Sequence, residues 1–278
     1  MSIKTKIKHL FHPIQGEIWC LHRVVWQKSI FSSNRELEIT PDFLKDLITE
    51  KIQQGFSFVS IDDILSDINC KKWDLRKKKR INISFDDGFL DIYENAFPIF
   101  KKMNIPFTIY LVGDFPEKTS DLWWIQLEQY VNNDPQLFEN RMKHFYNSNE
   151  NMRDLMHKVT ETSPDKDLSE KMTLSWNQLQ EMVSSGLCTI GCHSMTHPAL
   201  TRISHSQMAK ELSESKQLIE NNIQTTVKHF SYPHSMENKQ IQTVLKNLGY
   251  QSACIGYGGS IRKGDNPFKL NRKYIIQK

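Results

Sequence analysis

The sequence has no hydrophobic run long enough to cross a membrane. Only 38% of its 278 residues are hydrophobic, the mean hydropathy is −0.53, and no stretch of 18 consecutive apolar residues occurs. The first 15 residues alternate lysines with apolar side chains, which argues against a secretory signal peptide. We expect a protein of the cytoplasm or of the cytoplasmic face of the inner membrane, with peripheral membrane contact through the basic N-terminus as an alternative.

The sequence also lacks a disulfide framework. The five cysteines are odd in number, form no CxxC pair and lie mostly beside apolar, strand-like residues. Cysteine in such places behaves as a small hydrophobic side chain. This pattern fits a reducing compartment better than an oxidising one.

The sequence has no strong charge bias that would indicate a macromolecular partner. The net charge is only +4, and the most basic segment is "KKWDLRKKKR" at residues 71–80. This run either forms a solvated loop before a strand or attracts an anionic sugar carrier or a phosphorylated glycan. No recognised nucleic-acid motif accompanies it, so we expect no binding to nucleic acid.

Short apolar runs alternate with amphipathic helical segments along most of the chain. We expect strands at "EIWCLHRVV", "FSFVS", "INISF", "PFTIYLVG", "LCTIGCH", "VKHFSYP" and "YQSACIG". Strand–helix alternation with short connections predicts an α/β fold built on a parallel sheet or a barrel. In both architectures, functional residues gather at the carboxyl ends of the strands.

Residues 117–172 interrupt this alternation. The segment is polar and rich in Asn and Lys, with helix-like pieces around Trp123–Val131 and Leu137–Lys158. We interpret it as a helical insertion over the strand ends, within a single domain that spans residues 1–278.

Two adjacent acids end one of the expected strands. In "ISFDDGFLD", Asp86 and Asp87 follow the run "INISF", and Gly88 allows a sharp backbone turn. A solvated turn is the simplest interpretation of this motif alone. Because functional residues gather at strand ends, a site is the alternative.

Two histidines follow another expected strand. His193 and His197 in "LCTIGCHSMTHPAL" are spaced i and i+4, so the imidazoles would face the same way if the segment becomes helical. Such a pair is often only a surface feature. Together with a carboxylate from "DDG", however, it makes a two-histidine, one-carboxylate set for a divalent metal. One Asp would then bind the metal while its neighbour acts as a base.

The conjunction of "SFDDG" and "HSMTHP" resembles the first two motifs of the polysaccharide deacetylases, the NodB-homology or carbohydrate esterase 4 family. "LHRV" resembles the family's first-strand segment, and "FSYPHS" stands where many members have an FxYPYG-like motif. The end of the chain, "YGGS…NPFKLNRKYI", resembles members from bacterial surface-glycan gene clusters. The resemblance spans most of the chain.

The resemblance implies a distorted (β/α) barrel with about seven strands and a metal-dependent removal of acetyl groups from N-acetylated sugars. Carried over by position, Asp86 is the catalytic base, and Asp87, His193 and His197 are the metal ligands. The implied ion is Zn2+, with Co2+ or Ni2+ as alternatives. Tyr232 and Pro233 belong to the substrate-binding motif, and the backbone N–H of His234 would face the developing oxyanion.

The chain departs from the family pattern at two places. The arginine that orients the base is replaced by Ser231, and the late histidine that protonates the leaving amine has no counterpart, since "NPFKLNRKYI" offers Leu270 and Arg272. His22 or His234 could act as the acid, or both could be structural.

The expected function is therefore N-deacetylation of a surface polysaccharide or of a lipid- or nucleotide-linked precursor. Trp123 and Trp124 at the start of the insertion would stack on the sugar or pack in the core. Alternatives on the same scaffold are a deformylase, an O-deacetylase, or a glycan-binding protein with weakened catalysis.

Overall fold

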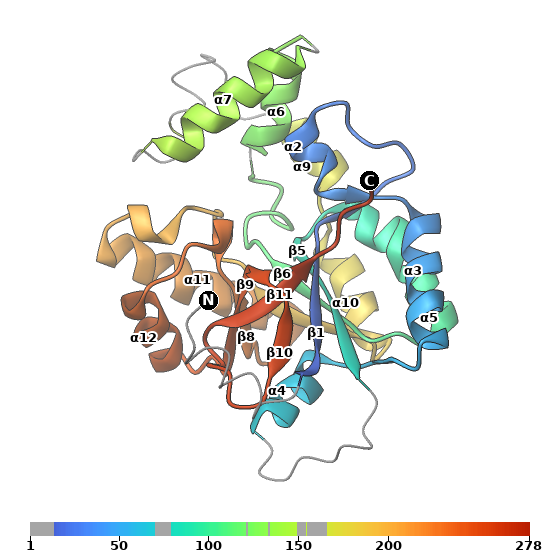
Figure 1. Cartoon of the computed structure of the whole chain (residues 1–278). Helices are drawn as coiled ribbons and strands as arrows, with labels where there is room; N and C mark the ends of the chain where they lie inside the picture. The colour runs from blue at the N-terminus through green and yellow to red at the C-terminus, as the bar shows by residue number, and fades with distance from the viewer. Residues whose placement is uncertain (1–13, 70–78, 121, 133, 149–153, 155–165) are drawn as a thin grey trace, which may run out of the picture.

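A closed barrel of seven parallel strands forms the centre of the protein (Figure 1). The computed structural model describes residues 14–69, 79–120, 122–132, 134–148, 154 and 166–278. β1 pairs in parallel with β5 on one side and with β11 on the other, which closes the ring. In chain order the wall consists of β1 (Ile14–Leu21), β5 (Arg80–Asp87), β6 (Phe107–Leu111), β7 (Cys188–Cys192), β8 (His229–Ser231), β9 (Ser252–Gly258) and β11 (Leu270–Tyr274).

The predicted barrel with about seven strands is confirmed, but its seventh wall strand is not the expected one. "FSFVS" contributes only β4 (Ser57–Phe58), which pairs with the first two residues of β5. The wall is completed by β11, whose alternation was not recognised in the sequence. β10 (Ser260–Arg262) adds to β1 in antiparallel orientation, and β2 (Arg23–Val24) pairs with β3 (Glu38–Ile39) in a separate two-stranded sheet.

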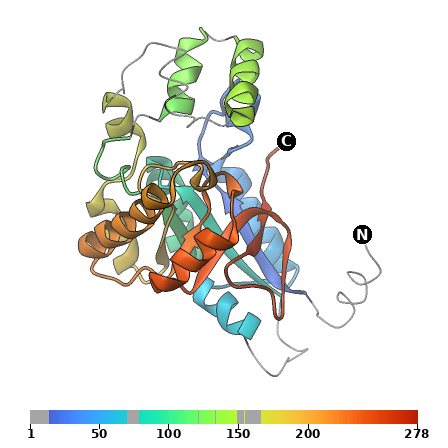
Figure 2. The ribbon, with the colours of Figure 1, turned by 90° about the vertical axis from the view of Figure 1, so that its left-hand side faces the viewer.

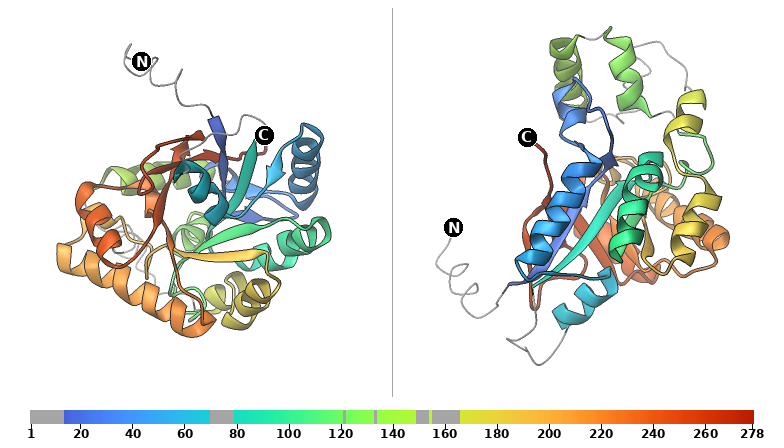
Figure 3. Two further views of the ribbon diagram at one scale, coloured as in Figure 1. Left: turned by 90° about the horizontal axis from the view of Figure 1, so that it is seen from below. Right: turned by 90° about the vertical axis from the view of Figure 1, so that its right-hand side faces the viewer.

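Helices surround the barrel, as the view from below shows (Figure 3). They form where the sequence supplies caps and an apolar face: Thr40 Oγ1 accepts from the N–H of Phe43, and Pro41 is the first helical residue of α3. No helix in the described part of the chain is long and apolar enough to span a membrane. The outer helices are α3 (Pro41–Gln53), α4 (Ile61–Asn69), the π-helical turn η1 (Ile92–Ala96), α5 (Phe97–Met103), α10 (Trp176–Ser184), α11 (His205–Ile223) and α12 (Lys239–Asn247).

The main apolar core lies between the barrel wall and these helices. Seven of the eight residues of β5 and all five residues of β6 are buried, as expected for strands covered on both faces. Aromatic rings fill much of this layer: Phe100 packs on Phe107 with centroids 4.7 Å apart and on Phe85 at 6.0 Å.

The expected helical insertion stands over the carboxyl ends of the strands (Figure 2). It contains α6 (Trp123–Tyr130), α7 (Pro135–Asn147) and α9 (Lys166–Met172). We call α6 and α7 together the roof. The roof has its own apolar cluster, in which Phe138 packs against Phe31, next to the short helix α2 (Ser32–Arg35). The expected continuation of the helix to residue 158 and most of the basic run at 71–80 lie outside the described residues.

We expect Ile83→Ala, within β5, to lower the free energy of unfolding by about 2–5 kcal/mol, because Ile83 is completely buried and the change leaves a cavity. Ile52→Ala on α3 is the matched control, since Ile52 is 45% exposed and should change stability by no more than about 0.5 kcal/mol. Urea unfolding followed by circular dichroism measures both. Equal effects of the two substitutions would contradict the packing described here.

Candidate active site

Asp86 and Asp87 are the last two residues of β5, and the backbone turns them toward different partners. Asp87 has a left-handed φ of 74°, and Gly88 follows with a φ of 107°. A β-carbon at Gly88 would lie 2.5 Å from Leu111 Cδ1, so glycine suits this turn in both conformation and space. Both carboxylates are buried, with 4% and 3% exposed. The turn separates two acids that the sequence places side by side.

A bidentate ion pair holds Asp86. Arg272 Nη1 donates to Asp86 Oδ1 at 2.7 Å, and Arg272 Nη2 donates to Oδ2 at 2.6 Å. Ser231 Oγ donates to the same Oδ2 at 3.2 Å. Burial alone would raise the pKa of Asp86, but the guanidinium of Arg272 holds that pKa well below its usual range. Asp86 is therefore an ionised carboxylate in a fixed orientation.

Arg272 was missed as a partner of Asp86 in the sequence. The arginine expected beside the base is replaced by Ser231, and the structure supplies one from β11 instead, 186 positions after Asp86. Arg272 is 1% exposed, and its Nε donates to the carbonyl of Ile255 at 3.0 Å. Its Nη2 also donates to Ser231 Oγ at 2.9 Å, so Ser231 links the two partners. No local pattern could have shown this pairing, because it depends on where the barrel closes.

The second acid, Asp87, faces both histidines predicted as ligands. Its Oδ1 lies 3.7 Å from His193 Nε2 and 3.6 Å from His197 Nε2. One ligand atom from each of the three residues lies within 4.8 Å of the others. The structure thus brings together the set expected from "SFDDG" and "HSMTHP".

This set fits a divalent cation. Asp87 Oδ1 is buried without a hydrogen-bond partner, and its distances to the imidazole nitrogens are too long for hydrogen bonds. Burial, and then the neighbouring charge of Asp86, raise the pKa of Asp87 well above its usual range. A buried carboxylate in this position is ionised only beside a cation, and two imidazoles with one carboxylate leave open coordination positions.

His193 is oriented by a contact on the far side of its ring. Its Nδ1 lies 2.8 Å from the carbonyl oxygen of Ser231, a distance that fits donation from Nδ1–H and leaves Nε2 free to act as a ligand. Burial lowers the pKa of His193 and thereby favours the neutral imidazole, the form that binds metals.

A loop rather than a helix carries the two histidines. The helical spacing considered from the sequence is wrong here, because Ser194 and His197 both have left-handed φ values, 68° and 57°. Glu211 of α11 secures the loop: its carboxylate accepts from the N–H groups of Met195 and Thr196 at 2.9 Å each and from Thr196 Oγ1 at 2.8 Å. Glu211 is a second residue whose role the sequence did not indicate.

His22, one candidate acid, lies beside Asp86 at the end of β1. Ligand-type atoms of Cys20, His22 and Asp86 all lie within 4.8 Å of one another. Because Arg272 already occupies both oxygens of Asp86, this group is unsuited to a second cation. Burial lowers the pKa of His22 to about 4 and raises that of the Cys20 thiol, so both groups are uncharged at neutral pH.

His234, the other candidate acid, lies on the opposite side of the site. It belongs to the 3-10 turn η3 (Pro233–Ser235) and has a left-handed φ of 55°. Its ring centroid is 4.6 Å from that of His197. Burial lowers the pKa of His234 to about 4. The two candidates therefore flank the site, with His22 next to Asp86 and His234 next to a predicted metal ligand.

Of the residues predicted to bind substrate, three line the cavity and one does not. Trp123 and Trp124 line the cavity but are only 4% and 8% exposed, and they belong to the apolar cluster of the roof. Tyr232 also lines the cavity, although its hydroxyl donates to the carbonyl of Phe268 at 2.9 Å in the interior. Pro233 is buried and is not among the described residues that line the cavity.

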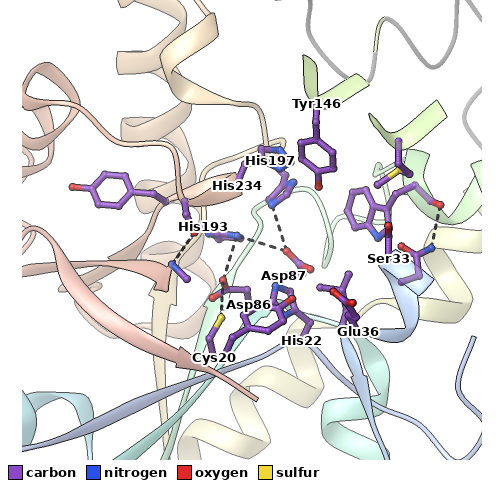
Figure 4. A pocket seen from close by; sticks show the side chains of 18 of the residues that line it. Cys20, His22, Ser33, Glu36, Asp86, Asp87, Tyr146, His193, His197 and His234 are labelled. Atoms are coloured by element: carbon purple, nitrogen blue, oxygen red, sulfur yellow. Dashed lines mark hydrogen bonds and ion pairs between the residues drawn. The ribbon is translucent and has the colours of Figure 1, made fainter. Parts of the chain in front are cut away.

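The two acids, the histidines predicted as ligands or acids, and Arg272 all line one cavity of about 330 Å³ between the barrel and the roof (Figure 4). Tyr146, at the end of α7, contributes a further group that the sequence did not indicate: its hydroxyl points toward His197 and Asp87. Tyr146 is 44% exposed overall, but partial desolvation, and then the charge of Asp87, raise the pKa of its hydroxyl. The described lining residues from the roof and from the segment around α2 are Ser33, Asn34, Glu36, Leu37, Trp123, Trp124, Met142 and Tyr146.

Proteins of known structure share this fold. Deacetylase PplD of Streptococcus pyogenes, solved in complex with acetate, superposes with a TM-score of 0.70 at 18% identity, over 95% of this chain and 93% of PplD. IcaB from Ammonifex degensii superposes with a TM-score of 0.68 at 19% identity, over 95% of this chain and 93% of IcaB. At these identities the likeness shows the fold.

Sequence comparison shows the family. YxkH of Bacillus subtilis (strain 168), whose name assigns it to the polysaccharide deacetylases, is 22% identical over 195 residues. The match covers 70% of this chain and 51% of YxkH, so the chain spans about half the length of that curated relative. The family profile described as polysaccharide deacetylase matches residues 74–253, well over half of the chain. The matched region contains Asp86, Asp87, His193 and His197, which lie together at the strand ends. This match shows that the chain belongs to the polysaccharide deacetylase family.

Proposed function

We propose that this protein is a metal-dependent hydrolase that removes acetyl groups from N-acetylated sugars of a bacterial surface polysaccharide or its precursor. One observation carries the proposal: an ionised carboxylate fixed by Arg272 stands directly beside a three-residue set suited to a divalent cation. Family membership supports the choice of an acetylated glycan as the substrate class.

Asp87, His193 and His197 would hold the metal ion. Two imidazoles, one carboxylate and open positions suit Zn2+, and Co2+ or Ni2+ are alternatives. When bound, the ion would polarise the amide carbonyl and lower the pKa of a water molecule. His193 would keep its orientation through the contact between its Nδ1 and the carbonyl of Ser231.

Asp86 would take the proton from the attacking water. A general base must be ionised and must hold its lone pairs in a fixed direction. Arg272 and Ser231 fix the direction of the carboxylate through their hydrogen bonds, and the charge of Arg272 keeps its pKa low. In this proposal Arg272 is a positioning residue, which acts through Asp86.

The leaving amine also needs a proton. With pKa values of about 4, His22 and His234 are neutral at pH 7 and hold no proton in reserve for donation. The proton that Asp86 accepts from water is then the one available to the amine. His22, which lies beside Asp86, is the better placed of the two histidines to relay it.

The charge that develops on the carbonyl oxygen needs a hydrogen-bond donor. In the family pattern the backbone N–H after the motif proline faces this oxygen, and here that residue is His234. Its left-handed conformation belongs to the tight turn η3, and a backbone donor requires no particular side chain. The change from the usual tyrosine to histidine therefore preserves this role.

The alternative of a glycan-binding protein with weakened catalysis was based on two departures from the family pattern, the missing arginine and the missing late histidine. The structure removes the first of them. The arginine missing from the sequence motif is replaced in space by Arg272, in bidentate contact with the base. Only the absence of the late histidine still favours that alternative.

The split roles of the two acids can be tested by substituting each one. Asp86→Asn should retain bound metal but lower the rate of acetate release by about 10²- to 10⁴-fold, because the base is lost. Asp87→Asn should lose both the metal and the activity, because a ligand is lost. Metal content is measured by elemental analysis of the purified protein, and acetate release on an N-acetylated oligosaccharide. Equal loss of metal in the two variants would refute the assignment.

The role of Arg272 can be tested with Arg272→Lys, which keeps the charge but cannot bind both oxygens of Asp86. We expect unchanged metal content and a fall in kcat of about 10-fold or more. The pKa of Asp86 should rise once the bidentate contact is lost, so activity should disappear at a higher pH on the acidic side than in the wild type. A pH profile of kcat/KM with an unshifted acidic limb would show that Arg272 is only structural.

A further inference from the structure

We propose that the α6–α7 roof restricts this enzyme to a single sugar unit at a chain end or on a simple carrier, and excludes internal units of a polysaccharide. The inference rests on the proposed function and specifies its substrate class. It follows from how the roof is attached, what it contributes to the cavity, and which charges the cavity lacks.

On the side of α2 the roof is attached by two partly exposed carboxylates, Glu139 and Glu128. Glu139 of α7 accepts from Ser32 Oγ at 2.6 Å, from Ser33 N–H at 2.9 Å and from Ser33 Oγ at 2.6 Å. Glu128 of α6 accepts from Ser29 Oγ and from Asn34 Nδ2, both at 2.7 Å. Hydrogen bonds to an ionised acceptor are stronger than neutral ones, so these contacts fix the roof on this side.

The roof is also fastened on the opposite side of the cavity. Arg202, in the 3-10 turn η2 (Leu200–Arg202) after the histidine loop, donates from Nη2 to the carbonyl of Tyr146 at 2.7 Å. Ala199 and Met236, from the loops that carry His197 and His234, pack against the apolar cluster of the roof. The roof therefore crosses the mouth of the barrel and is held at both ends, over the catalytic groups (Figures 2 and 4).

The space that the roof leaves is small. The cavity of about 330 Å³ lies near the lower end of the usual range for ligand sites, roughly 300–1,000 Å³. Trp124 and Tyr146 of the roof come close to the metal-binding set: their rings lie 5.6 Å from His197 and 5.9 Å from His234, centroid to centroid. A sugar unit at the catalytic groups would have these rings directly above it. A polymer bound through an internal unit would need a continuous groove at this place, and the rings occupy it.

The charges of the cavity favour a neutral unit. Among the described residues that line it there is no lysine, and Arg272 is already bound to Asp86. Glu36 adds an exposed negative charge at the rim. A phosphate or diphosphate carrier would find no unpaired cationic side chain among these lining groups. Because the proposed metal ion would be engaged by the acyl carbonyl and the water molecule, the carrier would have to remain outside, with only the terminal N-acylated unit inside.

The test uses tetramers of N-acetylglucosamine and of N-acetylgalactosamine, isotopically labelled at the reducing end, with the methyl glycosides of both sugars. Tandem mass spectrometry locates the unit that loses the first acetyl group. We expect one terminal unit to react at least about ten times faster than any internal unit. First loss at internal units, or equal loss at all four, would overturn this inference but leave the proposed function intact. Absence of acetate from every tetramer and both methyl glycosides would instead refute the proposed function.

The contribution of the roof is tested by Glu139→Ala, which removes its three hydrogen bonds to Ser32 and Ser33. The ratio of internal to terminal reaction should rise several-fold in this variant. Glu50→Ala is the matched control, because Glu50 is an exposed residue of α3, and the ratio should not change. A ratio that stays constant in Glu139→Ala while the roof loosens, as judged by faster proteolysis of α7, would show that the roof does not select the position of attack.

Discussion

Two carboxylates buried side by side at the end of a strand set the constraint on which the site depends. Asp86 and Asp87 would repel each other in a low-dielectric interior, and each needs positive charge of its own. Arg272 supplies the positive charge beside Asp86. A cation bound by Asp87, His193 and His197 would supply it beside Asp87. The chain turns at Asp87, which has a left-handed φ, and the two carboxylates have different partners although both lie near His193.

The charge that balances Asp86 depends on how the barrel closes. Arg272 reaches Asp86 only because β11 lies beside β1, which in turn pairs with β5. From β11 the guanidinium reaches Asp86 on β5, two strands away, and also contacts Ser231 on β8. The motif lacks the arginine of the family pattern, yet Asp86 is held by a guanidinium that comes from another strand. Substitution within a motif is therefore poor evidence of lost activity until the closure of the barrel is known.

The roof adds a second level of control. Barrel strand ends provide the chemical groups, whereas the insertion between β6 and α10 provides the aromatic rings above them. Its anchors are carboxylates that bind hydroxyl, amide and backbone donors around α2, together with the contact between Arg202 and the end of α7. In the proposed function, the groups for catalysis and the groups that would select the substrate thus come from separate parts of the chain.

The sequence by itself determined the strand–helix alternation and the four central residues. Each of these has a local signal: apolar runs of strand length, two acids before a glycine, and two histidines after a strand. Parallel strands with short connections bring their carboxyl ends to one edge, so "SFDDG" and "HSMTHP" could be expected to meet. The seventh wall strand was not recognised, because β11 alternates only weakly and follows an irregular segment.

Only the tertiary structure decided which groups surround those four residues. Arg272, Glu211 and Tyr146 lie far from the motifs in the chain, and their roles depend on barrel closure, on helix packing and on the position of the roof. The sequence left open whether a helix carries the two histidines, and in the structure a loop with left-handed residues brings them together. Local patterns encode which side chains stand at the end of a strand. Contacts between distant segments decide which charges they meet, because burial and distance determine the energy of a charge.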